Sequence, residues 1–461
     1  MTMARSFIQN FSIKGLFGYK DVSIDFDENV KIIIAENGAG KTTILSCLYY
    51  LLNGDYESLL KIKFASISIK FDSRKDAFCF DKQQIRSYCQ YLISSRDEES
   101  NVSSYVKRVL GDNLLHELVN KSLSTDDMDM LYDEYHQEIH FPRSLWHQIL
   151  STLIESEQKY KTFRNLNQFL NSTGYKFLYY PTYRRIEEDF RNILKYKKRN
   201  RHAVPRSEMD EYFDNTIIKF GMNDVEERIG KIVDIIKQSS VSGFASVSGS
   251  MITKLLENDL NSEVSQDFNI EEVSIVLSRV GRNLSEADKK KIINQIKVDS
   301  DLSEQEPFLR YFLRQLLDVY RTQQKYDTAI KKFVDVCNKY LENKRFVYDE
   351  SNVNIRIERC CDNNNEEANK NECDNIDLKC LSSGEKQIVS IFSQLYLELD
   401  CKFLILFDEP ELSLSLYWQQ ILLPDIMESN KCMFMLAVTH SPFIYDNVLR
   451  DSAVALSIYS K

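Results

Sequence analysis

Alternating apolar and polar residues at the start of the chain predict strands. The stretches SFIQNFSIKGL and KDVSIDFDENVKIIIA alternate with a period of two and end in an apolar run at 32–34. A loop with two glycines follows. TTILSCLYYLLNG then places its apolar residues at helical spacing and reaches Gly54, which is a typical residue just after a helix end. IKFASISIKFD alternates again and predicts one more strand. The order strand, loop, helix and strand predicts an α/β unit at this end.

Helical spacing dominates the middle of the chain, from residue 86 to residue 345. The segments 225–238 and 307–341 are the clearest cases, with apolar positions three, four or seven apart, which suits a bundle or a short coiled coil. One interruption, KFLYYPTYRRIEEDF, has a short apolar strand followed by proline. We interpret residues 175–190 as a candidate return to the sheet of the first unit.

Strand patterns return in the last part of the chain. RFVYD and NVNIRIER alternate, whereas CKFLILFDEP and MFMLAVTHSPFIYD contain the continuous apolar runs of buried parallel strands. Between them, LKCLSSGEKQIVSIFSQLYLEL reads as a turn that opens a helix. The fold class expected is therefore α/β, a mixed sheet flanked by helices and split by a large, mainly helical insertion. The expected domains are an N-terminal lobe at 1–85, the insertion at 86–345 and a C-terminal lobe at 346–461.

The charge composition limits how the chain could bind nucleic acid. The 461 residues carry 59 basic and 69 acidic side chains, a formal net charge of -10, so any nucleic-acid contact needs a local basic patch. The basic run at 184–201 is the candidate for a nucleic-acid or partner contact, although a solvated helix face is the alternative; its residues include Arg184, Arg185, Lys197, Lys198 and Arg199.

Cysteine usage and hydropathy indicate the cellular compartment in which the chain works. Ten cysteines lie scattered without a disulfide framework, no signal peptide is recognisable, and the apolar runs are too short to cross a bilayer. We therefore expect a cytoplasmic protein in a reducing compartment, with no membrane contact.

The stretch AENGAGKTT approaches the phosphate-loop pattern GxxxxGK[ST] between a buried strand and a helix. Backbone N–H groups of such a loop wrap phosphates, the lysine neutralises phosphate charge and the threonine hydroxyl reaches Mg²⁺. Ala35 stands where the pattern has its first glycine. The expected ATP-binding residues are Asn37, Gly38, Ala39, Gly40, Lys41, Thr42 and Thr43.

Two acids follow the apolar strand of LILFDEP. At the carboxyl end of a parallel strand, Asp408 is placed to hold Mg²⁺ together with Thr42, and Glu409 is placed to polarise an attacking water. An acidic turn after a buried strand is the plain structural alternative.

Two further motifs complete the set. Ser382, Ser383, Gly384 and Glu385 open a helix, either as another anion-binding N-terminus or only as a capping box. His440 follows a buried strand, either as a γ-phosphate contact or as a core histidine.

The ordered set NGAGKT, LSSGEKQ, LILFDEPE and VTHSP resembles the ABC-type ATPases of the Rad50, SMC and RecF group, within the AAA ATPases. The resemblance implies two heads that sandwich two ATP molecules, each site combining one subunit's phosphate loop with the other's signature turn. It implies that Ser382, Ser383, Gly384 and Glu385 act in trans, that Glu409 and His440 are catalytic, and that residues 411–415 contact the dimer partner. The glutamine that senses Mg²⁺ is not placed by the motif; Gln83 and Gln84 are candidates.

The length and YYPTYRRIE resemble the stand-alone ATPases of bacterial antiphage defence, the PtuA family of Septu and retron systems. This implies a homodimer or larger oligomer that regulates a separate HNH nuclease (PtuB-like), with a retron reverse transcriptase and its nucleic acid, or other DNA or RNA, as further partners. The alternative is a RecF- or Rad50-like clamp on DNA in repair or chromosome maintenance. A nucleotide-gated scaffold with slow turnover is the third hypothesis.

Overall fold

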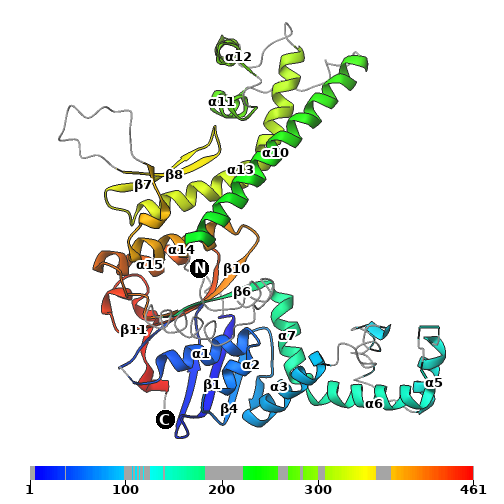
Figure 1. Ribbon diagram of the computed structural model, residues 1–461. Helices are drawn as coiled ribbons and strands as arrows, with labels where there is room; N and C mark the ends of the chain where they lie inside the picture. Colours follow the sequence, from blue (N-terminus) through cyan, green and yellow to red (C-terminus); the bar gives the residue numbers. More distant parts are fainter. Residues whose placement is uncertain are drawn as a thin grey trace, which may run out of the picture. The chain divides into compact units, whose positions relative to one another are not determined.

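The computed structural model describes residues 6–36, 38–97, 106, 109–111, 114, 118, 125–135, 137–138, 141–181, 222–257, 268–280, 284–298, 307–359 and 375–459 (Figure 1). The chain forms two compact units. The first comprises residues 1–185, 402–410 and 432–461, and the second comprises residues 186–401 and 411–431. These units divide the chain differently from the three segments expected at 1–85, 86–345 and 346–461. The three expected segments remain a prediction.

The first unit is built around a five-stranded parallel sheet with the strand order β12-β3-β11-β10-β6. Its strands are β3 (Val30–Ile34), β6 (Tyr175–Tyr180), β10 (Lys402–Asp408), β11 (Cys432–Thr439) and β12 (Ala453–Ala455). The apolar runs of β3, β10 and β11 are almost wholly buried, as expected for parallel strands covered on both faces. Helix α1 (Lys41–Leu52) packs against β10 and β6.

A second sheet in the same unit is antiparallel, with the order β2-β1-β4-β5. Its strands are β1 (Ile8–Leu16), β2 (Lys20–Asp25), β4 (Ser66–Phe71) and β5 (Phe78–Asp81). Strand β4 alternates buried and half-buried residues, so one face of this sheet packs inward. Parallel and antiparallel strands are thus both present, but they occupy separate sheets.

Helices complete the first unit. They are α2 (Tyr56–Leu60), α3 (Lys82–Asp97), α5 (Thr125–Glu134), α6 (Arg143–Lys159) and α7 (Lys161–Thr173), with the short 3-10 turns η3 (Pro442–Ile444), η4 (Arg450–Ser452) and η5 (Leu456–Tyr459). Phe163 and Phe169 of α7 pack against aromatic rings of β4, β5 and α3, so aromatic contacts hold α7 to the antiparallel sheet. Trp146 of α6 is fully buried in a separate cluster with Leu150 and Leu153.

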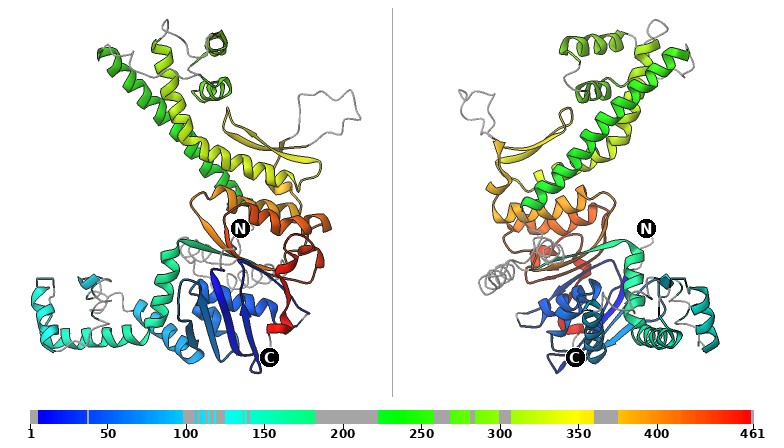
Figure 2. Two further views of the ribbon diagram at one scale, coloured as in Figure 1. Left: turned by 180° about the vertical axis from the view of Figure 1, so that it is seen from behind. Right: turned by 45° about the vertical axis from the view of Figure 1, so that its right-hand side comes forward.

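The second unit is dominated by two long helices, α10 (Met222–Glu257) and α13 (Pro307–Asn338), which run side by side in every view (Figure 2). A Cβ at Gly243 would collide with the Val319 side chain, so this glycine permits the close approach of the two helices. Helices α11 (Ile270–Arg279) and α12 (Glu286–Val298) pack against the pair through a shared apolar cluster.

The hairpin of β7 (Lys344–Asp349) and β8 (Asn354–Arg359) lies along α13, and β9 (Asn375–Ile376) extends its sheet. The 3-10 turn η2 (Leu378–Cys380) leads into α14 (Ser383–Leu397), and α15 (Leu416–Glu428) completes the unit. Arg228 of α10 bonds to Glu398 and Ser393 at the end of α14, while Tyr340, just after α13, donates a hydrogen bond of 2.8 Å to Asp425 of α15.

The α/β fold class with a large, mainly helical insertion is confirmed. The helix expected at 307–341 is α13, and the apolar part of the segment at 175–190 is β6, which pairs in parallel with β10. The sequence patterns missed β5, β9 and β12, which have only 4, 2 and 3 residues. Within the described ranges, no helix is both long and apolar enough to span a membrane.

Candidate nucleotide site

The loop between β3 and α1 owes its path to two glycines. Gly38 and Gly40 have φ of 81° and 89°, in the left-handed region where L side chains are strained. A Cβ at Gly40 would lie 2.9 Å from the Phe17 ring, so the β1–β2 turn closes against this part of the loop. Lys20, the first residue of β2 after this turn, donates a hydrogen bond of 3.0 Å to the Ala39 carbonyl. The sequence motif did not reveal that this turn supports the loop.

Ala35 adopts an ordinary backbone conformation. It lies just after β3 and is not among the described residues with positive φ. Its substitution for the first glycine of the pattern therefore introduces no left-handed strain. Its carbonyl accepts a hydrogen bond of 2.9 Å from the Lys41 ammonium.

Three side chains that are far apart in the sequence meet at the carboxyl edge of the parallel sheet. Lys41 begins α1 after β3, Glu409 follows β10 and His440 follows β11. The Lys41 ammonium contacts the His440 ring and lies 4.0 Å from the Glu409 carboxylate, which lies 3.7 Å from His440. This Lys41–Glu409–His440 cluster arises because β3, β11 and β10 are neighbours in the sheet.

Glu409 is held in an unusual backbone conformation. Its φ is 52°, and its N–H donates a hydrogen bond of 2.8 Å to the Val438 carbonyl of β11. A left-handed residue other than glycine costs roughly 1–2 kcal/mol, and such strain is concentrated at functional sites. The turn directs Glu409 to the cluster, whereas Asp408, the last residue of β10, is buried with 2% of its surface exposed.

The donor set fits a magnesium ion that is shared with a nucleotide. Thr42 supplies a hydroxyl in the first turn of α1, and Asp408 supplies a carboxylate at the end of β10; oxygen donors of this kind suit Mg²⁺. The described part of the chain contains no group of three or more His, Cys, Asp or Glu side chains that could hold a metal by itself. Mg²⁺ commonly takes its other ligands from phosphates and water.

The turn at residues 382–385, here called the signature turn, opens α14 with a capping box. The Ser382 hydroxyl accepts a hydrogen bond from the Glu385 N–H, and the Glu385 carboxylate accepts one of 2.7 Å from the Ser382 N–H. A Cβ at Gly384 would collide with the Ser413 carbonyl, so only glycine fits there. Ser382 and Ser383 are exposed, while Gly384 and Glu385 are buried.

Several sequence-derived candidates are not placed at the site. Asn37 and the basic residues Arg184, Arg185, Lys197, Lys198 and Arg199 lie outside the described residues. Gln84 accepts a hydrogen bond of 3.1 Å from the Asp81 N–H at the start of α3, and Gln83 is exposed. Gln84 therefore has a local capping role, and neither glutamine gains support as the Mg²⁺ sensor.

Structural comparison finds SMC head domains. The chain is similar to the Smc head domain of Pyrococcus furiosus with an extended coiled coil, bound to the C-terminal domain of ScpA: 14% identity, TM-score 0.36, covering 97% of this chain and 93% of that chain. It is also similar to an SmcHead bound to the C-winged helix domain of ScpA, with 10% identity, TM-score 0.35 and the same coverages. A third is the Smc head domain of Pyrococcus yayanosii with a coiled coil and joint, with 12% identity, TM-score 0.32 and coverages of 97% and 94%.

Sequence comparison gives the family. No curated protein matches the chain significantly. The family model described as the AAA ATPase domain matches residues 7–445, which is nearly the whole chain. That match includes the phosphate loop, the signature turn and the Lys41–Glu409–His440 cluster. The chain therefore belongs to the AAA ATPase domain family.

Proposed function

We propose that this chain is an ABC-type ATPase head that hydrolyses ATP between two copies of itself and thereby regulates a separate HNH nuclease in bacterial antiphage defence. Family membership implies ATP binding. The observation that carries the ATPase part is the Lys41–Glu409–His440 cluster at the carboxyl edge of the parallel sheet. A cation, a carboxylate and an imidazole together suit phosphoryl transfer to water.

Each side chain of the site has a distinct task in this proposal. The loop N–H groups around Gly38 and Gly40 bind the phosphates, and Lys41 neutralises charge that develops on the transferred phosphoryl group. Glu409 orients and deprotonates the attacking water, and His440 contacts the γ-phosphate. Thr42 and Asp408 would hold Mg²⁺, which supplies charge neutralisation at the phosphates when bound.

The signature turn acts on the nucleotide of the partner copy. Exposed Ser382 and Ser383 at the N-terminus of α14 offer hydroxyl and N–H donors to an anion. The phosphate loop of the same chain already provides such donors, so a second set is useful at a shared site. Residues 411–415 are proposed to contact the partner as well.

The backbone conformation of Ala35 predicts how ATP binding and hydrolysis respond when the first glycine of the phosphate-loop pattern is restored. We expect Ala35→Gly to change ATP affinity and kcat by less than about twofold, because Ala35 has no left-handed strain to relieve. Gly40→Ala is the contrasting variant, since it adds strain at φ 89° and a clash with Phe17; we expect ATP affinity to fall about tenfold or more. Fluorescent-nucleotide titration and phosphate release measure both. A several-fold gain in kcat for Ala35→Gly would contradict the prediction.

The proposed regulation of an HNH nuclease rests on the resemblance to Septu-type ATPases. Co-purification tests it. The tagged chain, expressed from its own locus with and without ATP, is expected to retain an HNH nuclease in a fixed ratio. Lys41→Ala is expected to weaken ATP-dependent retention, because Lys41 binds the phosphates in this proposal. If the neighbouring genes are intact and no nuclease co-purifies with or without ATP, the regulatory role is contradicted.

A DNA clamp of the RecF or Rad50 kind is the second candidate, favoured by the paired helices α10 and α13. These have 36 and 32 residues, so α10 is about 54 Å long at 1.5 Å per residue, and the pair forms a short arm. Stimulation of ATP hydrolysis by duplex DNA, without a nuclease partner, would favour this candidate. Unchanged hydrolysis with DNA would exclude it.

A further inference from the structure

The signature turn has a support that its own motif does not contain. Lys344, the first residue of β7, donates hydrogen bonds of 3.1 and 2.9 Å to the two carboxylate oxygens of Glu385. One of these oxygens also accepts the Ser382 N–H, so Lys344, Glu385 and Ser382 form a continuous chain of hydrogen bonds. These hydrogen bonds link β7 to Ser382, the residue that begins the signature turn.

Burial makes this contact strong. The side chains of Lys344 and Glu385 are 24% and 8% exposed. Burial alone would raise the pKa of Glu385, but hydrogen bonds from Lys344 and Ser382 outweigh it and hold the pKa below its usual value. Glu385 is therefore an ionised, buried carboxylate whose orientation depends on Lys344.

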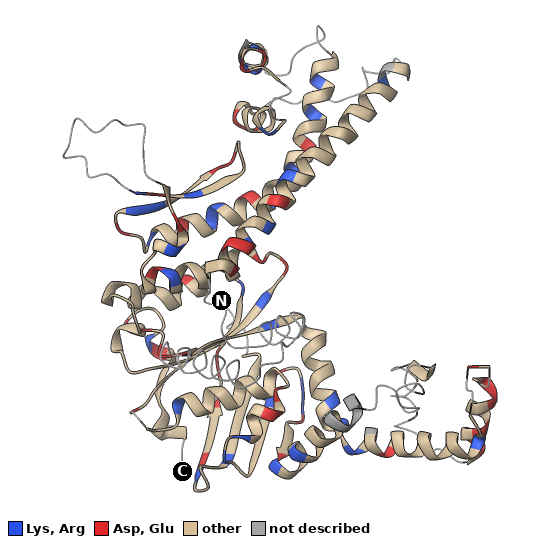
Figure 3. Ribbon diagram, viewed as in Figure 1, with Lys and Arg blue, Asp and Glu red and all other residues tan. Residues whose placement is uncertain are grey.

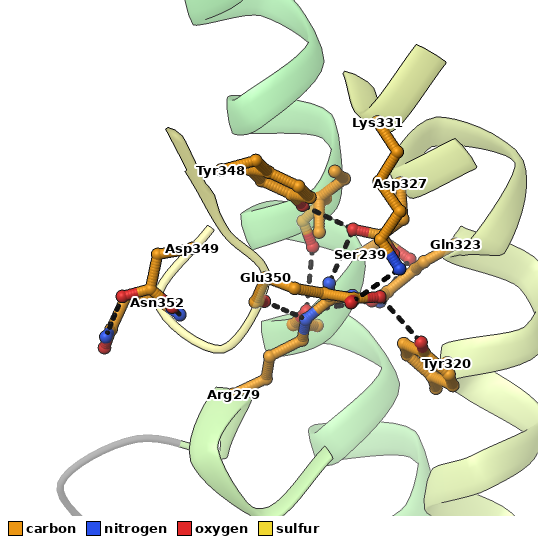
Figure 4. A network of polar contacts seen from close by, with 12 residues as sticks. Ser239, Arg279, Tyr320, Gln323, Asp327, Lys331, Tyr348, Asp349, Glu350 and Asn352 are labelled. Atoms are coloured by element: carbon orange, nitrogen blue, oxygen red, sulfur yellow. Dashed lines mark hydrogen bonds and ion pairs between the residues drawn. The ribbon is translucent and has the colours of Figure 1, made fainter. Parts of the chain in front are cut away.

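Strand β7 is in turn fixed to helix α13 near both ends. The Asn338 side chain accepts a hydrogen bond of 2.7 Å from the Phe346 N–H and donates one of 3.0 Å to the Phe346 carbonyl. Farther along, Tyr348 donates to Asp327 of α13 (Figure 4). Basic residues gather where β7 begins and β8 ends (Figure 3). Among them, Lys344 pairs with Glu385 of α14.

We propose that Lys344 is a positioning residue for ATP hydrolysis: it transmits the placement of α13 and β7 to Ser382 and Ser383 of the signature turn, which act on the partner copy's nucleotide. This proposal rests on the composite ATP site proposed above. Lys344 touches neither nucleotide nor reacting atoms, because its ammonium is directed to Glu385. A partner that displaces the α10–α13 arm would act on hydrolysis through this same contact.

A purely electrostatic role is the competing explanation, because any cation would neutralise buried Glu385. The variant pair Lys344→Met/Glu385→Gln and Glu385→Gln separates the two roles. Both lack the buried carboxylate charge of Glu385, and glutamine still serves as the capping residue. The ammonium that remains in Glu385→Gln is partly exposed, so we expect similar thermal stability. We expect kcat of the double variant to be at least about fivefold below that of Glu385→Gln, because the link to β7 is lost. Equal kcat values would overturn the proposal.

Two further measurements distinguish positioning from general damage. Lys344→Met is expected to lower kcat about tenfold, with ATP affinity changed less than about twofold, because the phosphate loop is intact. Lys344→Arg is expected to restore most of the activity, since guanidinium can bond both Glu385 oxygens. Loss of ATP affinity in Lys344→Met, or an Arg variant as inactive as Met, would contradict the proposal.

Subunit mixing shows whether the proposal or the proposed function has failed. A mixture of Lys344→Met and Lys41→Ala chains forms some dimers with one site built from an intact phosphate loop and an intact signature turn, so hydrolysis should recover. Gly384→Asp mixed with Lys41→Ala is the reference pair, because Gly384 admits no side chain. If neither mixture recovers, the composite site is wrong. If only the reference pair recovers, Lys344 has no role in positioning the turn.

Discussion

Replacing Glu409 with glutamine is expected to abolish ATP turnover while leaving ATP binding intact. Glu409 lies 4.0 Å from the Lys41 ammonium and 3.7 Å from His440, with its side chain 25% exposed, so water can reach it. Glutamine keeps the shape and can still orient water, but it cannot take a proton. General-base catalysis contributes typically 10²–10⁴-fold, so kcat should fall by at least about 100-fold.

ATP affinity is the informative second readout for Glu409→Gln. We expect it to change less than about threefold, because the phosphates are bound by Lys41 and the glycine loop. Dimers should accumulate in ATP, because the closed state no longer turns over, and light scattering measures this. Glu286→Gln is the matched control, since Glu286 is an exposed carboxylate on α12 that pairs with Lys289. Hydrolysis by Glu409→Gln above about a third of the wild-type rate would leave Glu409 without a catalytic role.

The meeting of three candidate side chains was predictable because each of them follows a strand of one sheet. Apolar runs identified β3, β10 and β11, and carboxyl ends of parallel strands share an edge, so Lys41, Glu409 and His440 could be expected to meet. The capping box of Ser382 and Glu385 could be expected from residue types three apart. Local spacing and one topological rule were sufficient for both.

Other features depend on contacts that local patterns do not encode. Strands β5 and β12 are too short for a period-two pattern to show. Glu409 has a left-handed φ, but glutamate is not a residue type that marks such a conformation in a sequence, as glycine or asparagine would. Lys344 gave no signal in the sequence, because its pairing with Glu385 arises only when β7 is placed beside α14. Such long-range pairings depend on the tertiary fold.

The polar cluster around Arg279 predicts the largest change in stability. Arg279 of α11 donates hydrogen bonds of 2.6 Å to Asp327 and 2.8 Å to Gln323, and another of 3.1 Å to the Glu350 carbonyl (Figure 4). The Arg279 and Asp327 side chains are only 4% and 3% exposed. Arg279→Met would leave the Asp327 carboxylate buried without its cation. We expect it to lower the free energy of unfolding of the second unit by about 3–5 kcal/mol.

Matched variants separate the buried charge from the loss of packing. Arg279→Met/Asp327→Leu removes both charges and should recover more than about half of the loss, because well-packed apolar pairs can replace buried ion pairs. Arg321→Met, on the same helix as Asp327, breaks the exposed pair with Asp318 and should cost less than about 1 kcal/mol. Hydrogen exchange of α13 amides in urea reports the second unit specifically. Equal costs for Arg279→Met and Arg321→Met would mean that water reaches Asp327 and that the cluster does not stabilise the attachment of β7 to the arm.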